Sequence, residues 1–289
     1  MKLTAASIMA TYNGSQFISD QLQSIYDQKI RPDQVIIRDD RSSDDTARIV
    51  EQFISSRHLE KSWDFKINPI RKGWRQNFIQ MISQTKTDVI FYTDQDDLWH
   101  EDKVSDYLNC FSQNNGIEAL VSDYSFIPKN QNILPMAKIP ESGQGPLYKV
   151  IPNLFNLLIR RDGCTLAFRK TLIPFLKEVF QKVSTDSNGL PQSHDQATWL
   201  SALLRGSLYH LHKPLLYRRA HQDSTWQREM KSHPSHFIED VDENPNFLAY
   251  LKMIRQVLMG DHLCTTFANI QLEREIQHKI ADFSKLAVS

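Results

Sequence analysis

The feature that most constrains the fold is the alternation of short apolar runs with longer amphipathic segments over the first 100 residues. Uninterrupted apolar runs fit buried strands, whereas apolar residues at spacings of three and four fit one face of a helix. A strand, helix, strand, helix order predicts a mostly parallel sheet covered by helices. The expected strands are residues 3–10, 34–38, 63–67 and 88–93, and the helices between them begin near Ser15, Asp44 and Gly73.

The rest of the chain is less regular. Residues 119–127 and 165–168 are expected strands, residues 172–182 and 195–205 are expected helices, and residues 128–152, rich in proline and glycine, are expected to form a loop. Two apolar stripes near the end of the chain predict a helix pair that packs on itself, on the main domain or on a partner chain. The stripes are Phe247, Leu251, Ile254 and Leu258, then Leu272, Ile276, Ile280 and Phe283. A membrane-surface role is the weaker alternative because the flanking charges are mixed.

Charge and cysteine content exclude several classes of protein. Lys and Arg number 34, as do Asp and Glu, so the chain carries no formal net charge. Nucleic-acid binders normally carry a basic excess, and we expect no nucleic-acid partner. Three cysteines without a CxxC pair indicate neither a disulfide framework nor a structural zinc site. A polar turn ends the first apolar run too early for a signal peptide, so we expect a cytoplasmic protein that is at most peripheral at a membrane.

The most informative segment for chemistry is the acidic run that follows the strand at residues 88–93. Asp94, Asp96 and Asp97 place three carboxylates within four positions. Such carboxylates repel one another unless solvent or a cation screens them, and Mg²⁺ or Mn²⁺ prefers carboxylate ligands together with substrate phosphates. A solvated acidic turn is the alternative, and this segment alone does not decide between the two.

Two further polar loops follow strands of the same predicted sheet. The loop at residues 10–14 offers the ring of Tyr12 for stacking on a base. It also offers backbone N–H donors near the start of a helix. Asp40 in the loop at residues 39–46 offers a carboxylate for hydrogen bonds from a base or ribose. For each loop taken alone, an ordinary turn and cap is the favoured interpretation.

Taken together, these segments resemble the inverting family 2 glycosyltransferases with a GT-A fold. The resemblance extends over roughly residues 3–226, and the order and spacing of the motifs carry it. The matching segments are ATYNG at 10–14, IIRDDRSSDDT at 36–46, the helix around Gly73 and Asn77, YTDQDDLW at 92–99, GCTLAFRK at 163–170 and SHDQATW at 193–199. The implied fold is α/β, a Rossmann-like mixed sheet flanked by helices, with a C-terminal helical extension.

The resemblance also implies roles for individual residues. Asp195 falls where the family places its catalytic base, and Asp94 and Asp96 match the DxD motif that holds a diphosphate through Mn²⁺ or Mg²⁺, with Asp97 beside them. The other residues implied to bind the donor are Thr11, Tyr12, Asp40, Arg71, Gly163, Cys164, Thr165, His194, Arg218 and His221. Without the resemblance, an ordinary helix cap is the favoured interpretation of Asp195, and Arg218 and His221 are equally part of a solvated turn.

The implied reaction is the transfer of one sugar, with inversion, from a nucleotide sugar to a glycan, glycolipid or glycoprotein acceptor. A QxxRW sequence typical of processive relatives is replaced here by residues 217–226, which favours single addition. Among donors dTDP-L-rhamnose is favoured, and UDP-hexoses stay open. A non-catalytic subunit that binds sugar nucleotides is the alternative from another class, while a nicotinamide-dependent dehydrogenase lacks the GxGxxG turn it would need.

The expected domain division follows from the same observations. Residues 1–230 are the predicted transferase domain, with a nucleotide-binding half at 1–100 and an acceptor half at 101–230, and residues 231–289 are the helical extension. We expect the loop at 128–152 to lie near the acceptor. Oligomerisation through the C-terminal helices is an open alternative. His210 and His212 flank an apolar residue in a spacing that did not by itself indicate a metal site.

Overall fold

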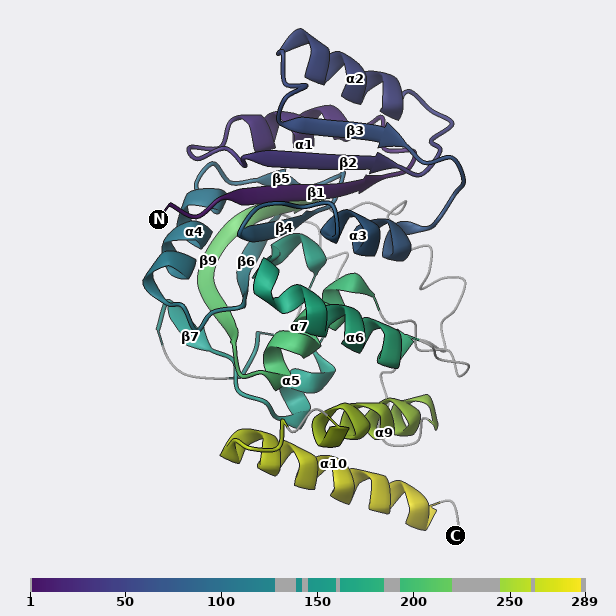
Figure 1. The fold of residues 1–289 in the computed structure, drawn as a ribbon, viewed down its shortest axis with the longest axis vertical. Helices are drawn as coiled ribbons and strands as arrows, with labels where there is room; N and C mark the ends of the chain where they lie inside the picture. Colours follow the sequence, from purple (N-terminus) through teal and green to yellow (C-terminus); the bar gives the residue numbers. More distant parts are fainter. Residues whose placement is uncertain are drawn as a thin grey trace.

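A computed structural model describes residues 2–127, 139–141, 145–159, 162–184, 193–219, 245–260 and 263–286 (Figure 1). The strands are β1 (Ala5–Thr11), β2 (Gln34–Asp39), β3 (Trp63–Ile67), β4 (Val89–Thr93), β5 (Leu98–Trp99), β6 (Ala119–Ile127), β7 (Leu147–Lys149), β8 (Leu166–Arg169) and β9 (Leu208–Arg219). The helices are α1 (Ile18–Tyr26), α2 (Thr46–Ser56), α3 (Trp74–Ile82), α4 (Lys103–Gln113), α5 (Leu154–Leu158), α6 (Ile173–Ser184), α7 (His194–Leu204), α9 (Pro245–Gly260) and α10 (Phe267–Leu286), with short 3-10 turns η1 (Gly163–Thr165) and η2 (Lys170–Leu172).

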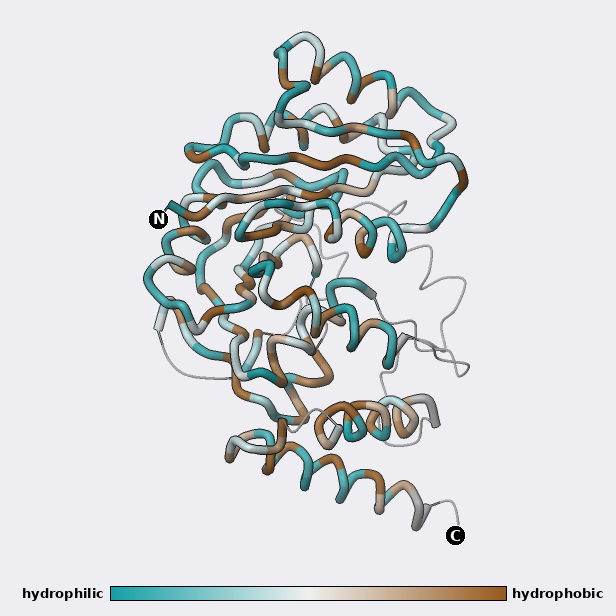
Figure 2. The backbone as a smooth tube through the Cα atoms, in the orientation of Figure 1, coloured by the Kyte–Doolittle hydropathy of each residue, from teal (hydrophilic) through white to brown (hydrophobic). Residues whose placement is uncertain are grey.

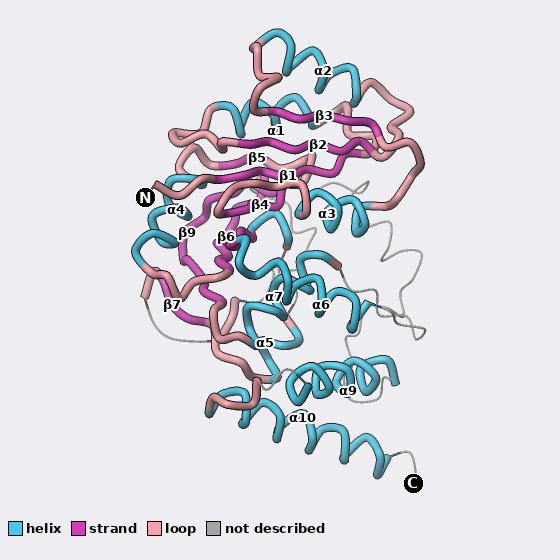
Figure 3. The backbone as a smooth tube through the Cα atoms, in the orientation of Figure 1, coloured by secondary structure: helices cyan, strands magenta, loops and turns pink. Residues whose placement is uncertain are grey.

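The strands of the described residues form one mixed sheet in the order β3-β2-β1-β4-β8-β6-β9-β5, with β7 paired to β9. β3, β2, β1 and β4 are parallel, as the alternating pattern predicted. β8 runs antiparallel to β4 and β6, and it therefore joins this half to the less regular half of the chain. Figure 3 shows the strands side by side with helices on both faces of the sheet. The predicted α/β class with a mixed sheet is confirmed.

Alternating strand residues divide the core between the two faces of the sheet. Ile8 and Ile36 contact the cluster covered by α3, α6 and α7, whereas Met9 and Ile37 contact the cluster covered by α1, α2 and α4. The hydrophobic stretches in Figure 2 follow these central strands. Successive side chains of a strand point to opposite faces, so strands buried on both faces have continuous apolar sequences.

The two C-terminal helices belong to the same core as the main domain. α9 packs on α10 and α6, and α10 also contacts α5. Phe247, Leu251 and Ile254 of the first predicted stripe are buried, as are Leu272 and Ile276 of the second. The expectation that the stripes pack on each other and on the main domain is therefore confirmed. Within the described residues, no helix combines the length and apolar character needed to cross a bilayer.

Two expectations about local structure need correction, and some elements were missed. The helix α1 does start near Ser15, but its N-cap is Phe17 and not Ser15, whose backbone N–H donates to Asp44. The segment at 128–152, expected to be irregular throughout, contains β7. β5 and α5 are too short for a periodic pattern and were not predicted, and α4 was missed although Val104, Tyr107, Leu108 and Phe111 recur at spacings of three and four.

Candidate active site

The parallel strands bring three polar loops to one edge of the sheet. Thr11 at the end of β1 is paired with Asp39 at the end of β2, and Met9 is paired with Thr93 at the end of β4. The loops that begin at residues 12, 40 and 94 therefore start side by side. This is the carboxyl edge at which open α/β sheets bind ligands.

Hydrogen bonds between these loops fix the first of them. The Tyr12 N–H donates to Oε1 of Gln95 at 2.9 Å, and the Gln95 Nε2 donates back to the Tyr12 carbonyl at 3.1 Å. The Thr11 hydroxyl donates to the buried Asp39 carboxylate at 2.8 Å. A Cβ on Gly14 would lie 2.4 Å from the Gln95 amide oxygen, so the close approach of Gln95 requires glycine there. Thr11 is therefore an organising residue, while Tyr12 stands at the edge with its ring half-buried.

Asp40 and Arg71 lie at the same edge. The Arg71 guanidinium carbon lies 3.9 Å from the centre of the Tyr12 ring, so the structure brings this expected pair together. The Asp40 carboxylate is buried and accepts hydrogen bonds from the backbone N–H groups of Lys72 and Gly73, each at 2.8 Å, and from the Asn68 amide at 3.1 Å. Asp40 thus holds the loop that carries Arg71.

The acidic residues after β4 form a compact group with a cysteine. Oxygen atoms of Asp94 and Asp97 and the Cys164 sulfur lie within 4.8 Å of one another. Burial, followed by the charges of Asp97 and Asp96, raises the pKa of Asp94 well above its usual value. Burial and the Asp96 charge raise the pKa of Asp97 to about 6. Burial also raises the pKa of the Cys164 thiol, so Cys164 is a neutral thiol at pH 7 and the oxygen donors of this group come from the two aspartates.

Two arginines at the end of β9 close one side of the acidic group. Arg218 forms an ion pair with Asp162, with 2.5 Å between its guanidinium nitrogen and the carboxylate oxygen. The Arg219 backbone N–H donates to the Asp97 carboxylate at 3.0 Å, and its side chain donates to the Asp96 carbonyl at 3.1 Å. The charge of Arg218 reaches both Asp94 and Asp97, where it lowers the pKa against the larger effect of burial.

The turn η1 lies between the acidic group and α7, and α4 supports it from within the core. The fully buried Lys103 ammonium donates to the Cys164 carbonyl at 2.5 Å, and the Tyr107 hydroxyl donates to the Thr165 carbonyl. The Thr165 hydroxyl donates to the Asp162 carbonyl at 2.8 Å, so it closes the turn. Lys103 and Tyr107 are four residues apart and share one face of α4.

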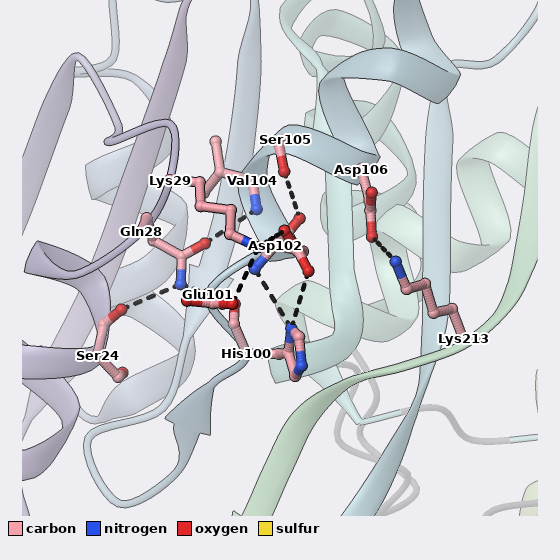
Figure 4. Close-up of polar contacts among 10 residues, drawn as sticks. All are labelled: Ser24, Gln28, Lys29, His100, Glu101, Asp102, Val104, Ser105, Asp106 and Lys213. Atoms are coloured by element: carbon pink, nitrogen blue, oxygen red, sulfur yellow. Dashed lines mark hydrogen bonds and ion pairs between the residues drawn. The ribbon is translucent and has the colours of Figure 1, made fainter.

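The start of α4 is fixed in turn by polar contacts with the end of α1 (Figure 4). The Gln28 side chain donates to the His100 carbonyl at 2.8 Å and accepts from the Val104 N–H at 3.1 Å. Lys29 forms ion pairs with Glu101 at 2.9 Å and Asp102 at 2.8 Å. These contacts determine where Lys103 enters the core.

Asp195 lies in the first turn of α7, directly against η1. Its Oδ1 accepts hydrogen bonds from the Ser193 hydroxyl and from the Gln196 N–H at 2.9 Å. A Cβ on Gly163 would lie 3.1 Å from the Asp195 Cβ and 3.3 Å from its Oδ2. The Asp195 charge also raises the pKa of Asp94. The structure therefore brings Asp195 and the acidic group to the same turn, with Gly163 against Asp195 and Cys164 against Asp94 and Asp97.

His194 is enclosed by aromatic rings beside Asp195. Its ring stacks on Phe78 at 3.9 Å between centres and meets the edge of Tyr92 at 4.4 Å. Within the described part of the chain, neither ring nitrogen has a hydrogen-bond partner. Burial lowers the pKa of His194 to about 4, so the ring is neutral at pH 7 and can donate or accept one hydrogen bond.

The expected site residues thus lie at one edge of the sheet, with the exception of His221, which lies outside the described residues. The sequence analysis missed Gln95, Asp39, Asp162 and Lys103 as organising residues. Gln95 is adjacent to residues that were singled out, and the signal for α4 is the apolar spacing of Val104, Tyr107, Leu108 and Phe111. Asp162 carries no local signal, since its partner Arg218 is distant in sequence.

Comparison with known proteins identifies the family. The model of glycosyl transferase family 2 matches residues 7–173. A dTDP-rhamnosyl transferase of Shigella flexneri, RfbG, is 27% identical over 226 residues, which cover 75% of this chain and 72% of that protein. An uncharacterized glycosyltransferase of Rickettsia typhi is 24% identical over 221 residues, and the match spans 75% of this chain and 64% of the relative's length.

Solved structures show the same fold at low sequence identity. TarS 1–349 of S. aureus, in complex with UDP-GlcNAc, has a TM-score of 0.65 at 17% identity, with 98% of this chain and 72% of that chain covered. A mannosyltransferase of Pyrobaculum calidifontis, in complex with GDP-Man and Mn²⁺, has a TM-score of 0.55 at 14% identity, with 99% and 87% covered. With the family model matching more than half of its length, the chain is a glycosyltransferase that belongs to glycosyl transferase family 2.

Proposed function

We propose that this glycosyltransferase moves one sugar, with inversion, from a nucleotide sugar to a glycan acceptor, with Asp195 as the base. The observation that carries the proposal is the position of Asp195, which contacts Gly163 while Cys164 contacts the acidic group. The proposed base and the proposed diphosphate site are then separated by about the width of the turn η1. The proposed sugar pocket lies between these two sites.

Asp94 and Asp97, with Asp96 beside them, are the residues proposed to hold Mn²⁺ or Mg²⁺. The donor set fits such an ion because hard divalent cations prefer carboxylate oxygens. The raised pKa values of Asp94 and Asp97 support the assignment, since they reflect crowded carboxylate charge in a buried place. When bound, the ion supplies positive charge to the departing diphosphate.

The side chains around the acidic group have complementary roles in the proposal. Arg218 provides a fixed positive charge next to the diphosphate, and its ion pair with Asp162 holds the guanidinium in place. Tyr12 and Arg71 provide stacking surfaces for the base of the nucleotide. Asp40 fixes the loop that carries Arg71, and in the proposal it also contacts the base.

Asp195 is arranged for proton transfer. In the described part of the chain its Oδ1 accepts two hydrogen bonds, whereas Oδ2 faces Gly163 and the proposed sugar pocket. The acceptor oxygen attacks the anomeric carbon as the bond to the diphosphate oxygen breaks, and its proton passes to Oδ2. The N-terminus of α7 stabilises the negative charge that the aspartate carries before that step.

The donor favoured by the proposal is dTDP-L-rhamnose. The support is the similarity of this chain to the dTDP-rhamnosyl transferase of S. flexneri. The acceptor class, cytoplasmic localisation, contact with a membrane surface and oligomerisation through α9 and α10 stay predictions, as does the acceptor side for residues 128–152.

The test of the proposal is a transfer assay with the Asp195→Asn variant. Purified chain is incubated with Mn²⁺, acceptor glycans and either dTDP-L-rhamnose or a UDP-hexose, and product is followed by mass spectrometry and its anomeric configuration by NMR. We expect inverted product and a kcat for Asp195→Asn lower by about 10² to 10⁴, with donor affinity nearly unchanged. Asp282→Asn on α10 is the matched control.

Two results would contradict the proposal. Full activity of Asp195→Asn would show that Asp195 is not the catalytic base. Loss of donor binding in that variant would show that Asp195 acts only as a structural cap. If the wild-type chain binds nucleotide tightly but forms no product with any donor, the chain is instead a binding subunit for a second transferase.

A further inference from the structure

A second group of metal-binding side chains lies outside the donor site. Atoms of Asp123 in β6 and of His210 and His212 in β9 lie within 4.8 Å of one another. His210 is fully buried, while 38% of the His212 side chain and 27% of the Asp123 side chain are exposed. Arg218 of the donor site lies six residues beyond His212 on β9, and its pairing partner on β6, Phe126, lies three residues beyond Asp123, so the two groups share no residue but lie on the same pair of strands.

The pairing of β6 with β9 explains how these residues meet. Residues at alternate positions of a strand share a face, so His210 and His212 project together. Val121 is paired with His210 and Ser122 with Leu211, but Asp123 is paired with Pro214. Two residues of β9, His212 and Lys213, therefore have no partner in the register with β6. This shift in register brings the Asp123 carboxylate beside both imidazoles.

The hydrogen bonds of Tyr148 determine the protonation of His210. The Tyr148 hydroxyl lies 3.0 Å from the Pro140 carbonyl, which can only accept, and 2.7 Å from the His210 Nδ1. Its single proton is used for the carbonyl, so Nδ1 must carry the proton that it donates to the hydroxyl. A neutral His210 then presents the lone pair of Nε2 to the Asp123 carboxylate, 2.9 Å away.

Two acceptors at that distance repel unless a proton or a cation lies between them. A second proton would make His210 a buried imidazolium. A metal ion instead uses both lone pairs, and a ligating histidine usually donates its other N–H to a fixed acceptor, as His210 does to Tyr148. His212 adds a third ligand, with its Nδ1 3.2 Å from the other Asp123 oxygen.

We propose that Asp123, His210 and His212 bind a zinc ion, with solvent as the fourth ligand. Zinc takes imidazole and carboxylate ligands in tetrahedral sites, where bonds of about 2.0–2.1 Å separate neighbouring ligand atoms by about 3.3 Å. With one ligand atom from each residue, the three atoms lie within 4.8 Å of one another, and side-chain shifts of up to about 1.5 Å bring them to this separation. The exposed edges of His212 and Asp123 admit the ion and the solvent ligand. The site would tie β6 to β9, and through Tyr148 to β7.

The test measures zinc binding by the full chain, stripped of metal with EDTA and kept free of nucleotide. Zinc is titrated against a chromophoric chelator, and Co²⁺ serves as a visible probe of tetrahedral coordination. The variants are His212→Gln and Asp123→Asn for the site, Tyr148→Phe for the residue that orients His210, and His278→Gln on α10 as the matched control. Asp94→Asn separates this site from the donor site.

We expect one equivalent of zinc in the wild-type chain, in His278→Gln and in Asp94→Asn. We expect at least a hundredfold loss of affinity in His212→Gln and Asp123→Asn, and about a 10- to 100-fold loss in Tyr148→Phe. Zinc should also raise the Tm of the wild-type chain, since it binds only the folded state. Sugar transfer is not part of the measurement, so these results are independent of the proposed function.

Three results would overturn the proposal. The first is wild-type chain that takes up no zinc and gives no tetrahedral Co²⁺ spectrum. The second is equal binding by His212→Gln and Asp123→Asn. The third is an NMR spectrum in which both His210 ring nitrogens stay protonated with zinc present, which would make the group an ion pair.

Discussion

Gly163 is the residue at which the geometry of the active site is least tolerant. A Cβ at this position would meet Asp195 and the His194 Nε2 at 3.1 to 3.3 Å, closer than most real contacts. Asp195 is held on its other side by Ser193 and the backbone of Gln196, so it has little room to move away. Glycine is required here by close approach and not by an unusual backbone angle.

We therefore expect Gly163→Ala to lower kcat by about tenfold or more, because small displacements of a catalytic group are costly. Donor affinity should change much less, and the Tm by only a few degrees. Gly260→Ala is the control, since a Cβ there meets nothing within 4 Å. Unchanged kcat in Gly163→Ala would show that the contact with Asp195 has no catalytic importance.

Asp97 is one of the buried groups that make the stability of the metal-free protein depend on pH. Its pKa rises from 3.8 to about 6 in the folded chain, so between these values the folded state binds more protons than the unfolded state. The contribution of protonated Asp97 to the free energy of unfolding is complete below about pH 4 and is lost as pH rises through about 6. We expect Asp97→Asn to remove this loss and to raise stability at pH 7 by on the order of 2 kcal/mol.

Denaturant unfolding in EDTA at pH 4.5 and pH 7.5 measures the effect of Asp97→Asn. The amide oxygen can still accept from the Arg219 N–H, so the change is confined to charge. Mn²⁺ should stabilise the wild-type chain more than the variant at pH 7.5. A variant that is less stable than the wild type at both pH values, without metal, would contradict the assignment.

At the scale of elements, α4 determines the position of the turn η1. The Tyr107 hydroxyl and the Lys103 ammonium both donate to carbonyls of that turn, and contacts with the end of α1 fix the start of the helix. α4 therefore acts on the turn beside the proposed sugar pocket from the core side. Tyr107 and Lys103 are positioning residues.

Tyr107→Phe tests this role with the loss of one hydroxyl. The Thr165 carbonyl loses a buried donor, which should cost about 1–3 kcal/mol of unfolding free energy. We also expect kcat to fall more than KM rises, because the turn that separates the acidic group from Asp195 becomes looser. Tyr26→Phe is the control, since the described contacts of Tyr26 to Arg31 and Phe53 are made by its ring. A purely structural role would lower the Tm and leave kcat unchanged at a temperature where both proteins are folded.

At the scale of the whole molecule, α9 and α10 complete the core on one face of the sheet. Their buried residues belong to the cluster that contains residues of α6 and α7. This continuity bears on the expected division into a transferase domain at 1–230 and an extension at 231–289. A shared core predicts that the extension unfolds together with the main domain.

Ile276→Ala distinguishes a shared core from a separate unit. Ile276 is fully buried, and its truncation should cost about 2–5 kcal/mol, whereas Ile270, which is 37% exposed, is the matched control with a much smaller expected cost. Calorimetry should show a single transition that moves to lower temperature. Two transitions, of which only one moves, would show that the extension is an independent domain.

Much of the fold and part of the site could be predicted from local patterns. The strands at 63–67 and 119–127 coincide with β3 and β6, because the first alternates apolar and polar residues and the second begins with an apolar run, and both patterns favour strands. The family motifs led to Asp94 and Asp195, and the structure places both at one edge. β5 and α5 could not be predicted, because tertiary contacts stabilise elements too short to have a periodic pattern.

The sequence alone therefore determined the class of sheet, its carboxyl edge and the family of the enzyme, since these depend on periodicity and on short motifs in order. Only the tertiary structure decided that Gly163 contacts Asp195, that Arg218 is paired with Asp162, and that Asp123 reaches His210 and His212. Each of these contacts joins residues far apart in the chain. Strand register and helix packing bring them together, and no local sequence pattern encodes the position of a residue on a distant element.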